Sequence, residues 1–590
     1  MGIKSGVNRG LLFFISAFVS SVIANLNITV FQKNSIADAS LLLIISALLL
    51  IQFLKAKTLL HFNYFEIVCL LLVAFTILKN QLAGTITISS FSYLVFFIIL
   101  YYGLKTMFTV NNISTPSFIL IAATATILFG YLAFAIYHCC FQNQTLTNFF
   151  IPNKSIFGIL LASQIAFVLP FLFYYNKQKA FSKPASWFFV ALISTSFVLL
   201  GFTQSRAGYI GLALSLSYMA YQYLPASKLK KPALFILVSG VCLFTAGVFL
   251  FKSGSSSGRL LIYKISAGML KDNWLFGIGQ GQFKIQYNQY QSAYFALHNI
   301  DSKEALLADN SFYAFNDFFQ ALIENGVFAF LLLAAILCLL LSQIKKAKTD
   351  SGYMHLFTAA VASLICIFCG CFVSYPLQIF PIVVQTILCI CIINSFQAEK
   401  KTQVQLSETG SKFAKGILLL LSSLLVIYFC FYVNYKGQFN KAIELKKSGF
   451  RQKAIEKYTV LSNSYIQEGN MLYLYAQDLY YTNQLTQARE ILTKAKKFYC
   501  TNEVYKLSAE IENELQNYSQ AEADYKKAIY MVPNRMVSRN ELLDFYLERK
   551  DTTNAILWAN SILNMPVKVP SQRTINIQKK VREVLEGQKK

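Results

Sequence analysis

Long apolar runs separated by short polar loops fill the first 435 residues of the chain. About thirteen of these runs have the length, roughly 16–24 residues, that lets a helix cross a bilayer. The pattern predicts an all-α, polytopic membrane protein, with transmembrane helices 1–9 in residues 1–251 and helices 10–13 in residues 326–434. The runs are centred near residues 21, 45, 71, 96, 128, 165, 196, 215, 241, 335, 365, 386 and 423.

Two segments interrupt this pattern. Residues 252–325 form a long loop between the ninth and tenth runs, here called the large loop, and residues 435–590 form a polar tail that favours helices. Within the tail, alanines recur every 33–34 residues, the period of a tetratricopeptide repeat (TPR). The tail therefore resembles a TPR-like helical solenoid, a fold that binds other proteins; an unrelated helical bundle is the alternative. The alanines are Ala454, Ala488, Ala521 and Ala555.

Lysines and arginines are concentrated in alternate loops, which is the positive-inside pattern of a chain with a cytoplasmic N-terminus. An odd number of spans then places the large loop and the tail outside, which means the periplasm if the membrane is a bacterial inner membrane. The basic groups precede the first run or follow even-numbered runs: Lys4 and Arg9; Lys55 and Lys57; Lys177, Lys179 and Lys183; Lys228, Lys230 and Lys231; Lys345, Lys346 and Lys348; Lys400, Lys401, Lys412 and Lys415.

The composition agrees with a membrane protein and argues against a nucleic-acid-binding protein and a metal site. Only 14% of the residues are charged, and the mean hydropathy is +0.47. In such a chain the net charge of +25 serves orientation and contact with membrane lipid, so we expect no nucleic-acid partner. Cys366 and Cys369 lie inside an apolar run with no second pair or His nearby, so we expect no metal site.

Arg206 lies between the seventh and eighth runs, in the sequence TQSRAG (203–208). A charge this close to hydrocarbon is costly unless it lies at the interface. Ser205 and Gly208 would let the backbone approach a bound anion there. An arginine that merely extends to the headgroups is the alternative.

The large loop supplies a second cation, Arg259, on an expected amphipathic helix that also carries Tyr263 and Lys264. The sequence DNWLFGIGQGQ (272–282) follows, and its three alternate glycines predict a tight turn. No Walker lysine follows these glycines, and the loop is expected outside the cell membrane, where ATP is scarce, so we expect no nucleotide site. We expect no cofactor elsewhere in the chain.

A polar stripe precedes the tenth run. Asn316, Gln320 and Glu324 are spaced i, i+4 and i+8, so they would share one face of the helix that enters the membrane. A solvated face is the alternative interpretation of this stripe. Asp309 lies seven residues before it.

Together, SRAG at a turn, GR…Y…MLKDNWLFGIGQGQF and FNDFFQALIENG resemble the O-antigen ligase family. That family also includes Wzy-type polymerases and bacterial O-oligosaccharyltransferases. The motif resemblance covers about residues 190–345, and the topology is similar over about residues 10–435. The resemblance to this family implies transfer of a glycan from undecaprenyl pyrophosphate to a lipid, sugar or protein hydroxyl, without metal or nucleotide. Arg206 and Arg259 match the family's arginines, and two guanidiniums suit a diphosphate leaving group.

The sequence departs from the family at the expected catalytic His. Asn316, nine residues and Gly326 fit the ligase motif, but the His position is Phe315. Three interpretations follow: Asp309 is the general base, the loop residue His298 moves in, or the enzyme works mainly by stabilising the leaving group. Asp309 is the interpretation that we favour, with Asn316 as a second catalytic residue and Tyr263, Lys264, Gln320 and His298 as further candidates.

The sequence thus predicts a membrane glycosyltransferase of the O-antigen ligase class, with a protein or lipid acceptor and a TPR tail that binds a protein partner. A Wzy-type polymerase, with the growing glycan as acceptor, is the nearest alternative. A glycolipid transporter would instead need ionisable residues at the bilayer midplane, where the runs carry few. A scaffold would need far fewer spans.

Overall fold

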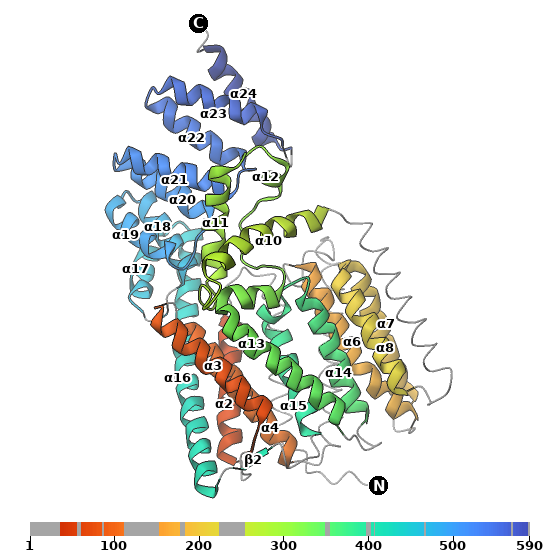
Figure 1. Ribbon diagram of the computed structural model, residues 1–590. Coiled ribbons are helices and arrows are strands. Elements are labelled where there is room, and N and C mark those ends of the chain that lie inside the picture. Colours follow the sequence, from red (N-terminus) through yellow and green to blue (C-terminus); the bar gives the residue numbers. More distant parts are fainter. Residues whose placement is uncertain are drawn as a thin grey trace.

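The computed structural model describes residues 36–55, 61–84, 88–110, 153–177, 183–223, 254–347, 354–396, 403–405 and 407–587, except 465, 467, 568 and 569. This part of the chain is almost entirely helical (Figure 1). Two three-residue strands, β1 (His61–Asn63) and β2 (Gln403–Gln405), pair antiparallel at the end of the molecule away from the tail. The expected all-α membrane fold is confirmed.

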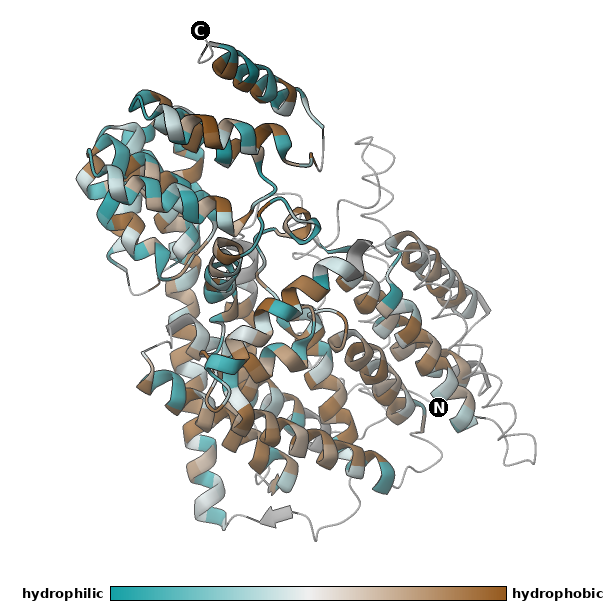
Figure 2. Ribbon diagram, turned by 45° about the horizontal axis from the view of Figure 1, so that its top comes forward, coloured by the Kyte–Doolittle hydropathy of each residue, from teal (hydrophilic) through white to brown (hydrophobic). Residues whose placement is uncertain are grey.

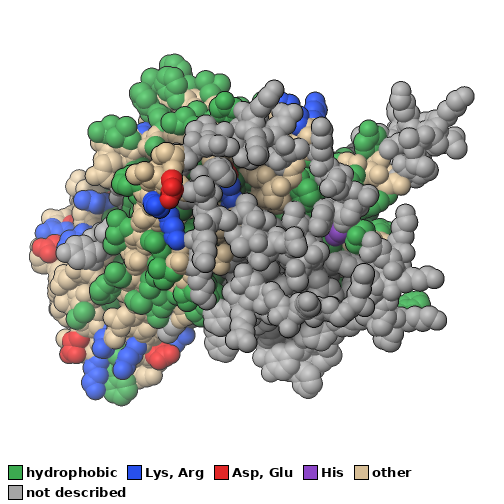
Figure 3. All heavy atoms as spheres, turned by 90° about the horizontal axis from the view of Figure 1, so that it is seen from below, with side chains coloured by type: hydrophobic (Ala, Val, Ile, Leu, Met, Phe, Trp, Pro, Cys, Tyr) green, Lys and Arg blue, Asp and Glu red, His purple; other side chains and the backbone are tan. Residues whose placement is uncertain are grey.

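The apolar runs form a bundle of hydrophobic helices (Figure 2), and hydrophobic side chains are spread over the described part of the face seen in Figure 3. Ten of the thirteen predicted runs have their centres inside helices, and the runs centred near 21, 128 and 241 lie outside the described residues. The bundle helices are α2 (Ile36–Lys55), α3 (Tyr64–Leu82), α4 (Ile88–Val110), α6 (Lys154–Lys177), α7 (Lys183–Thr203), α8 (Arg206–Tyr223), α13 (Asp317–Lys346), α14 (Met354–Cys371), α15 (Phe380–Ser395) and α16 (Glu408–Lys447).

Length and apolarity suffice for a membrane crossing in five of the described helices: α3, α6, α13, α14 and α16. Four more contain shorter apolar stretches, Leu42–Leu54, Ser90–Thr106, Phe189–Thr203 and Phe380–Ser395. The C-terminal part of α16 continues without a break beyond residue 435 into the tail. The division predicted between residues 434 and 435 therefore falls inside one helix, because a hydropathy change need not break a helix.

Glycines allow close packing of α8 against α6 and α14. A Cβ at Gly208 would lie 2.7 Å from the carbonyl oxygen of Gly158 in α6, and one at Gly211 would lie 2.9 Å from the Cα of Cys366 in α14. Ser215 donates to the carbonyl of Ala362 at 2.6 Å one turn further along. These contacts fix the start of α8, and with it Arg206, against the start of α6.

The large loop folds into α10 (Gly254–Asp272), α11 (Phe283–Leu297) and α12 (Lys303–Leu307), which lie above the bundle in Figure 1. Its three alternate glycines all have positive φ: 68° at Gly277, 112° at Gly279 and 73° at Gly281. The turn predicted from these glycines is thus confirmed. It wraps around a break in α13 at Gly326, where φ is 76°.

The tail is built from antiparallel helices that pack successively (Figure 1). The four recurring alanines lie in α17, α19, α21 and α23, and each is at most 1% exposed. The TPR assignment itself stays a prediction. The helices are α17 (Arg451–Ser462), α18 (Gly469–Tyr481), α19 (Leu485–Lys496), α20 (Asn502–Glu514), α21 (Tyr518–Met531), α22 (Met536–Glu548), α23 (Thr552–Asn564) and α24 (Gln572–Gly587).

Candidate functional site

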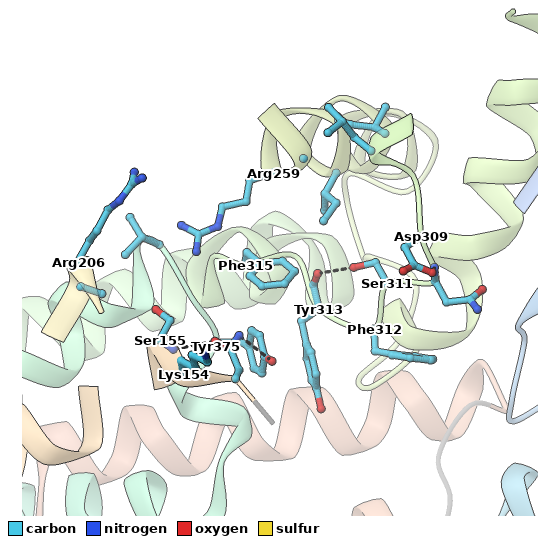
Figure 4. Close-up of a pocket in the computed structure, with 18 of the residues that line it drawn as sticks. Lys154, Ser155, Arg206, Arg259, Asp309, Ser311, Phe312, Tyr313, Phe315 and Tyr375 are labelled. Carbon is cyan, nitrogen blue, oxygen red and sulfur yellow. Dashed lines mark hydrogen bonds between the residues drawn. The ribbon is translucent and has the colours of Figure 1, made fainter. Parts of the chain in front are cut away.

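A cavity of about 1010 Å³ lies between the bundle and the large loop. The starts of α6 and α8 form one side, α10 forms another, and the segment from Leu307 to Phe315 runs along its length (Figure 4). Val373 and Tyr375, from the turn between α14 and α15, and Gln291 of α11 also line it. Segments that are far apart in sequence therefore converge on one space.

Arg206 is the first residue of α8 and lines this cavity. The preceding turn is held by Ser205, whose hydroxyl accepts from Gly208 N at 3.1 Å and donates to the Ser155 carbonyl at 2.8 Å. Ser205 thus caps α8 and ties it to α6, and Gln204 takes a positive φ of 49° to make the turn. The order Ser-Arg-Ala-Gly therefore places the guanidinium at a fixed helix start.

Arg259 projects from α10 into the same cavity and points toward Arg206 (Figure 4). Burial lowers the pKa of Arg259, and the positive charge of Arg206 lowers it further. Arg259 nevertheless stays charged, because a free guanidinium titrates far above neutral pH. Two cations that repel each other across a cavity favour an anion between them.

Lys154 is a third cation on the cavity wall, and sequence reasoning missed it. It is the first residue of α6, where Asn153 accepts a hydrogen bond from Ser155 N at 2.9 Å. The starts of α6 and α8 thus face one space, and each adds the partial positive charge of a helix N-terminus. The order Asn-Lys-Ser before an apolar run was the available signal for a capped helix start.

Aromatic rings line the middle of the cavity. Tyr313 and Tyr375 stack with ring centroids 3.9 Å apart, and Asn153 donates to the Tyr375 hydroxyl at 3.1 Å. Phe315, at the family's His position, has a positive φ of 55°, and its ring lies 5.4 Å from the Arg259 guanidinium carbon. Phe315 therefore supports Arg259 through a cation–π contact and has no group that could accept a proton.

Asp309 lines the opposite end of the cavity from the arginines (Figure 4), and Asn310, the next residue, also lines the cavity. The Asp309 side chain is 61% exposed and forms an ion pair of 3.1 Å with Arg535 of the tail. Asp309 is the one carboxylate among the described residues that line the cavity. The cavity therefore has a cationic end, at Lys154, Arg206 and Arg259, and an acidic end beside the tail.

The polar stripe on α13 has an internal role in the structure. Asn316 caps α13 by accepting from Phe319 N at 3.0 Å, and Gln320 accepts from Ala314 N at 3.0 Å. Glu324 is 2% exposed and accepts from Gly281 N at 3.0 Å and Phe283 N at 3.3 Å. The alternative of a solvated face is therefore excluded for Gln320 and Glu324, which hold the glycine turn and the segment before α13.

Three further candidates from the sequence, Tyr263, Lys264 and His298, belong to the large loop. Tyr263 donates to the Phe315 carbonyl at 3.1 Å and so supports the cavity from behind. Lys264 is exposed and pairs with Glu304 at 3.0 Å. His298 is exposed and stacks on Tyr294, whose carbonyl lies 2.7 Å from its Nδ1. The structure does not bring Lys264 or His298 into the cavity lining, because both project from the outer side of the large loop.

Comparison with known proteins adds an independent finding. Residues 189–334 match the family model described as O-antigen ligase. The match contains both arginines, the glycine turn and the break in α13, which are the features that form the cavity and its supports. No curated protein matches the chain. Residues 189–334 of this membrane protein therefore belong to the O-antigen ligase family.

Proposed function

We propose that this protein is a membrane glycosyltransferase that moves a glycan from undecaprenyl pyrophosphate to an acceptor hydroxyl on a protein or lipid. The observation that carries the proposal is the pair Arg206 and Arg259, which both line one large cavity, with Arg259 pointing toward Arg206. Family membership of residues 189–334 supports the reaction class. The positive-inside pattern supports an inner-membrane protein whose loop and tail lie in the periplasm.

The cationic end suits the diphosphate of the donor. As the bond between the anomeric carbon and the phosphate oxygen breaks, its electron pair remains on the diphosphate. Arg206, Arg259 and Lys154 would neutralise that growing charge, each through hydrogen bonds that strengthen toward the transition state. The positive charge comes from side chains, so the proposal requires no metal or other cofactor.

The acceptor hydroxyl would attack the anomeric carbon from the other end of the cavity. Its proton must leave as the new glycosidic bond forms, and Asp309 is the lining carboxylate that could take it. The aromatic rings of Tyr313, Phe315 and Tyr375 lie between the two ends, where a sugar ring of the donor would sit. We propose Asp309 as the general base on this geometry.

Transfer by the purified protein in nanodiscs, supplied with lipid-linked glycan from its own cells, tests the proposal. We expect Arg206→Ala and Arg259→Ala each to lower the rate of lipid diphosphate release about 100–1000-fold. Lys271→Ala is the matched control, because Lys271 lies on the same helix as Arg259 but outside the cavity lining. Unchanged rates in both arginine variants would refute the diphosphate site.

Deletion of the gene identifies the acceptor class. Loss of glycan from periplasmic proteins alone would indicate a protein O-oligosaccharyltransferase, and loss from lipid would indicate a ligase. Shortened polymer would indicate the alternative, a Wzy-type polymerase. Complementation with Arg206→Ala should fail in each case, whereas normal glycans in the deletion strain would contradict the transferase assignment.

A further inference from the structure

The tail is docked on the large loop at the acidic end of the cavity. Arg539 of α22 is fully buried and donates to Asp301 at 2.7 Å and to the carbonyl of Ile300 at 3.0 Å. Asn534 donates to the carbonyls of Leu306 and Ala308 at 2.9 and 2.6 Å. The segment that leads to Asp309 is therefore held by tail side chains along its length.

A second set of contacts reaches the cavity lining itself. The side-chain nitrogen of Asn310 donates to Asn502 Oδ1 at 2.8 Å and to Glu503 Oε2 at 3.1 Å. The side-chain oxygen of Asn310 accepts from the backbone N–H of Asn502 at 3.3 Å. Gln291, which also lines the cavity, donates to the carbonyl of Met531 in α21 and to that of Asp309 at 3.1 Å. Both lining residues thus depend on the tail for their position.

Arg535 joins these contacts at the end of the cavity. One of its terminal nitrogens donates to Glu503 of α20, and the other donates to Asp309 at 3.1 Å. A planar guanidinium with two donor sets can hold two carboxylates at a fixed separation, whereas a lysine ammonium is a single point charge. The carboxylate that the proposed reaction needs is therefore oriented by a residue more than two hundred positions later in the chain.

We propose that the tail forms part of the acceptor end of the active site and that Arg535 is a positioning residue for Asp309. This inference rests on the proposed transferase function and deepens it. The tail is then not a separate binding module attached to the enzyme. It completes the wall past which the acceptor reaches the donor, and the ring of Phe312, which lines the cavity, lies parallel to Tyr499 of the tail at 6.4 Å.

The test compares Arg535→Ala, Arg535→Lys and wild type in membrane vesicles from the deletion strain, with glycan transfer to native acceptors measured against donor concentration. We expect Arg535→Ala to lower the maximal rate at least tenfold without changing the donor concentration for half-maximal rate. Arg535→Lys should recover part of the rate, because an ammonium can still reach one carboxylate. Lys526→Ala is the control, because Lys526 pairs with Glu522 inside α21.

The rise in melting temperature caused by inorganic pyrophosphate reports on the cationic end of the cavity alone. It therefore distinguishes damage at the acceptor end from damage at the cationic end. We expect pyrophosphate to raise the melting temperature of wild type and Arg535→Ala equally. A lost pyrophosphate shift in Arg535→Ala would overturn the inference, since the tail would then act on the whole site. If the wild type transfers glycan and Arg535→Ala transfers it at the same rate, the inference is overturned but the proposed function is not. Absence of transfer by wild type would overturn the proposed function, and the inference with it.

Discussion

At the residue scale, Phe315 occupies the position at which the motif resemblance implies a catalytic His. Its ring lies 5.4 Å from the guanidinium carbon of Arg259. In the proposed reaction, either another group takes the proton of the acceptor or leaving-group stabilisation is sufficient. Of the two substitutes expected from the sequence, Asp309 lines the cavity and His298 does not.

Replacement of these two residues separates the interpretations. We expect Asp309→Asn to lower kcat about 100–10,000-fold, the usual contribution of a general base. His298→Ala should leave kcat unchanged, because its imidazole packs on Tyr294 outside the cavity lining. Steady-state transfer in nanodiscs measures both. Full activity of Asp309→Asn would favour catalysis by leaving-group stabilisation alone.

Lys154 allows a further residue-scale prediction. Lys154 is the first residue of α6 and lines the same cavity as the two arginines, so we expect it to bind the donor diphosphate of the proposed reaction. We expect Lys154→Met to weaken donor binding, seen as a higher donor KM and a smaller melting-temperature shift with pyrophosphate. An unchanged shift in Lys154→Met, together with the loss of the shift in Arg259→Ala, would exclude Lys154 from the anion site.

At the scale of elements, the segment from Asn316 to Gly326 of α13 both starts the helix and holds the glycine turn. The helix breaks at Gly326, where Val327 N donates to the Trp274 carbonyl at 3.0 Å and the glycine turn packs against the break. Glu324, on the turn before the break, fastens that glycine turn by accepting from Gly281 N and Phe283 N. The spacing from Asn316 to Gly326 therefore sets the distance between the helix cap and the break.

Substitution at the break tests this account. We expect Gly326→Ala to destabilise the fold by at least about 1–3 kcal/mol, the cost of a non-glycine residue in this backbone region. Its Cβ would also lie 2.2 Å from the Leu275 carbonyl oxygen. Gly268→Ala in α10 is the control, where nothing lies within 4 Å and helix propensity should even add about 1 kcal/mol. Thermal unfolding in detergent distinguishes them, and equal melting temperatures would contradict the packing described.

At the scale of the whole molecule, the tail and the large loop share a small apolar cluster between their own cores. Ile285 of α11 packs with Cys500, Met531 and Val532 of the tail, and Ile300 packs against the last helices. The loop and the tail are thus expected to unfold together. Such a shared cluster explains why the tail can orient a residue of the cavity.

Substitution of Arg539 tests whether the large loop and the tail unfold together. It is fully buried, while its partner Asp301 has a side chain that is 32% exposed. We therefore expect Arg539→Ala to cost near the lower limit of the about 3–5 kcal/mol found when a buried ion pair loses one member. The large loop and the tail should both become more sensitive to limited proteolysis. Lys579→Ala, at an exposed pair, should change neither stability nor proteolysis, and protection of the loop in Arg539→Ala would argue against joint unfolding.

The sequence by itself determined the helical membrane fold, the glycine turn and the family. Hydropathy is a local property of about 20 residues, and positive φ at glycine is a local backbone preference, so neither needs distant contacts. The order of motifs was sufficient to single out Arg206 and Arg259.

Only the tertiary structure decided which residues share the cavity. Lys154 and Tyr375 reach it because α8 packs closely against α6 and α14, and Asp309 meets Arg535 because the tail folds back onto the loop. Contacts with the glycine turn and with Ala314 made the stripe of Gln320 and Glu324 a buried support instead of a solvated face. These relations join positions up to 226 residues apart, and a linear pattern contains no information on which distant segments will meet.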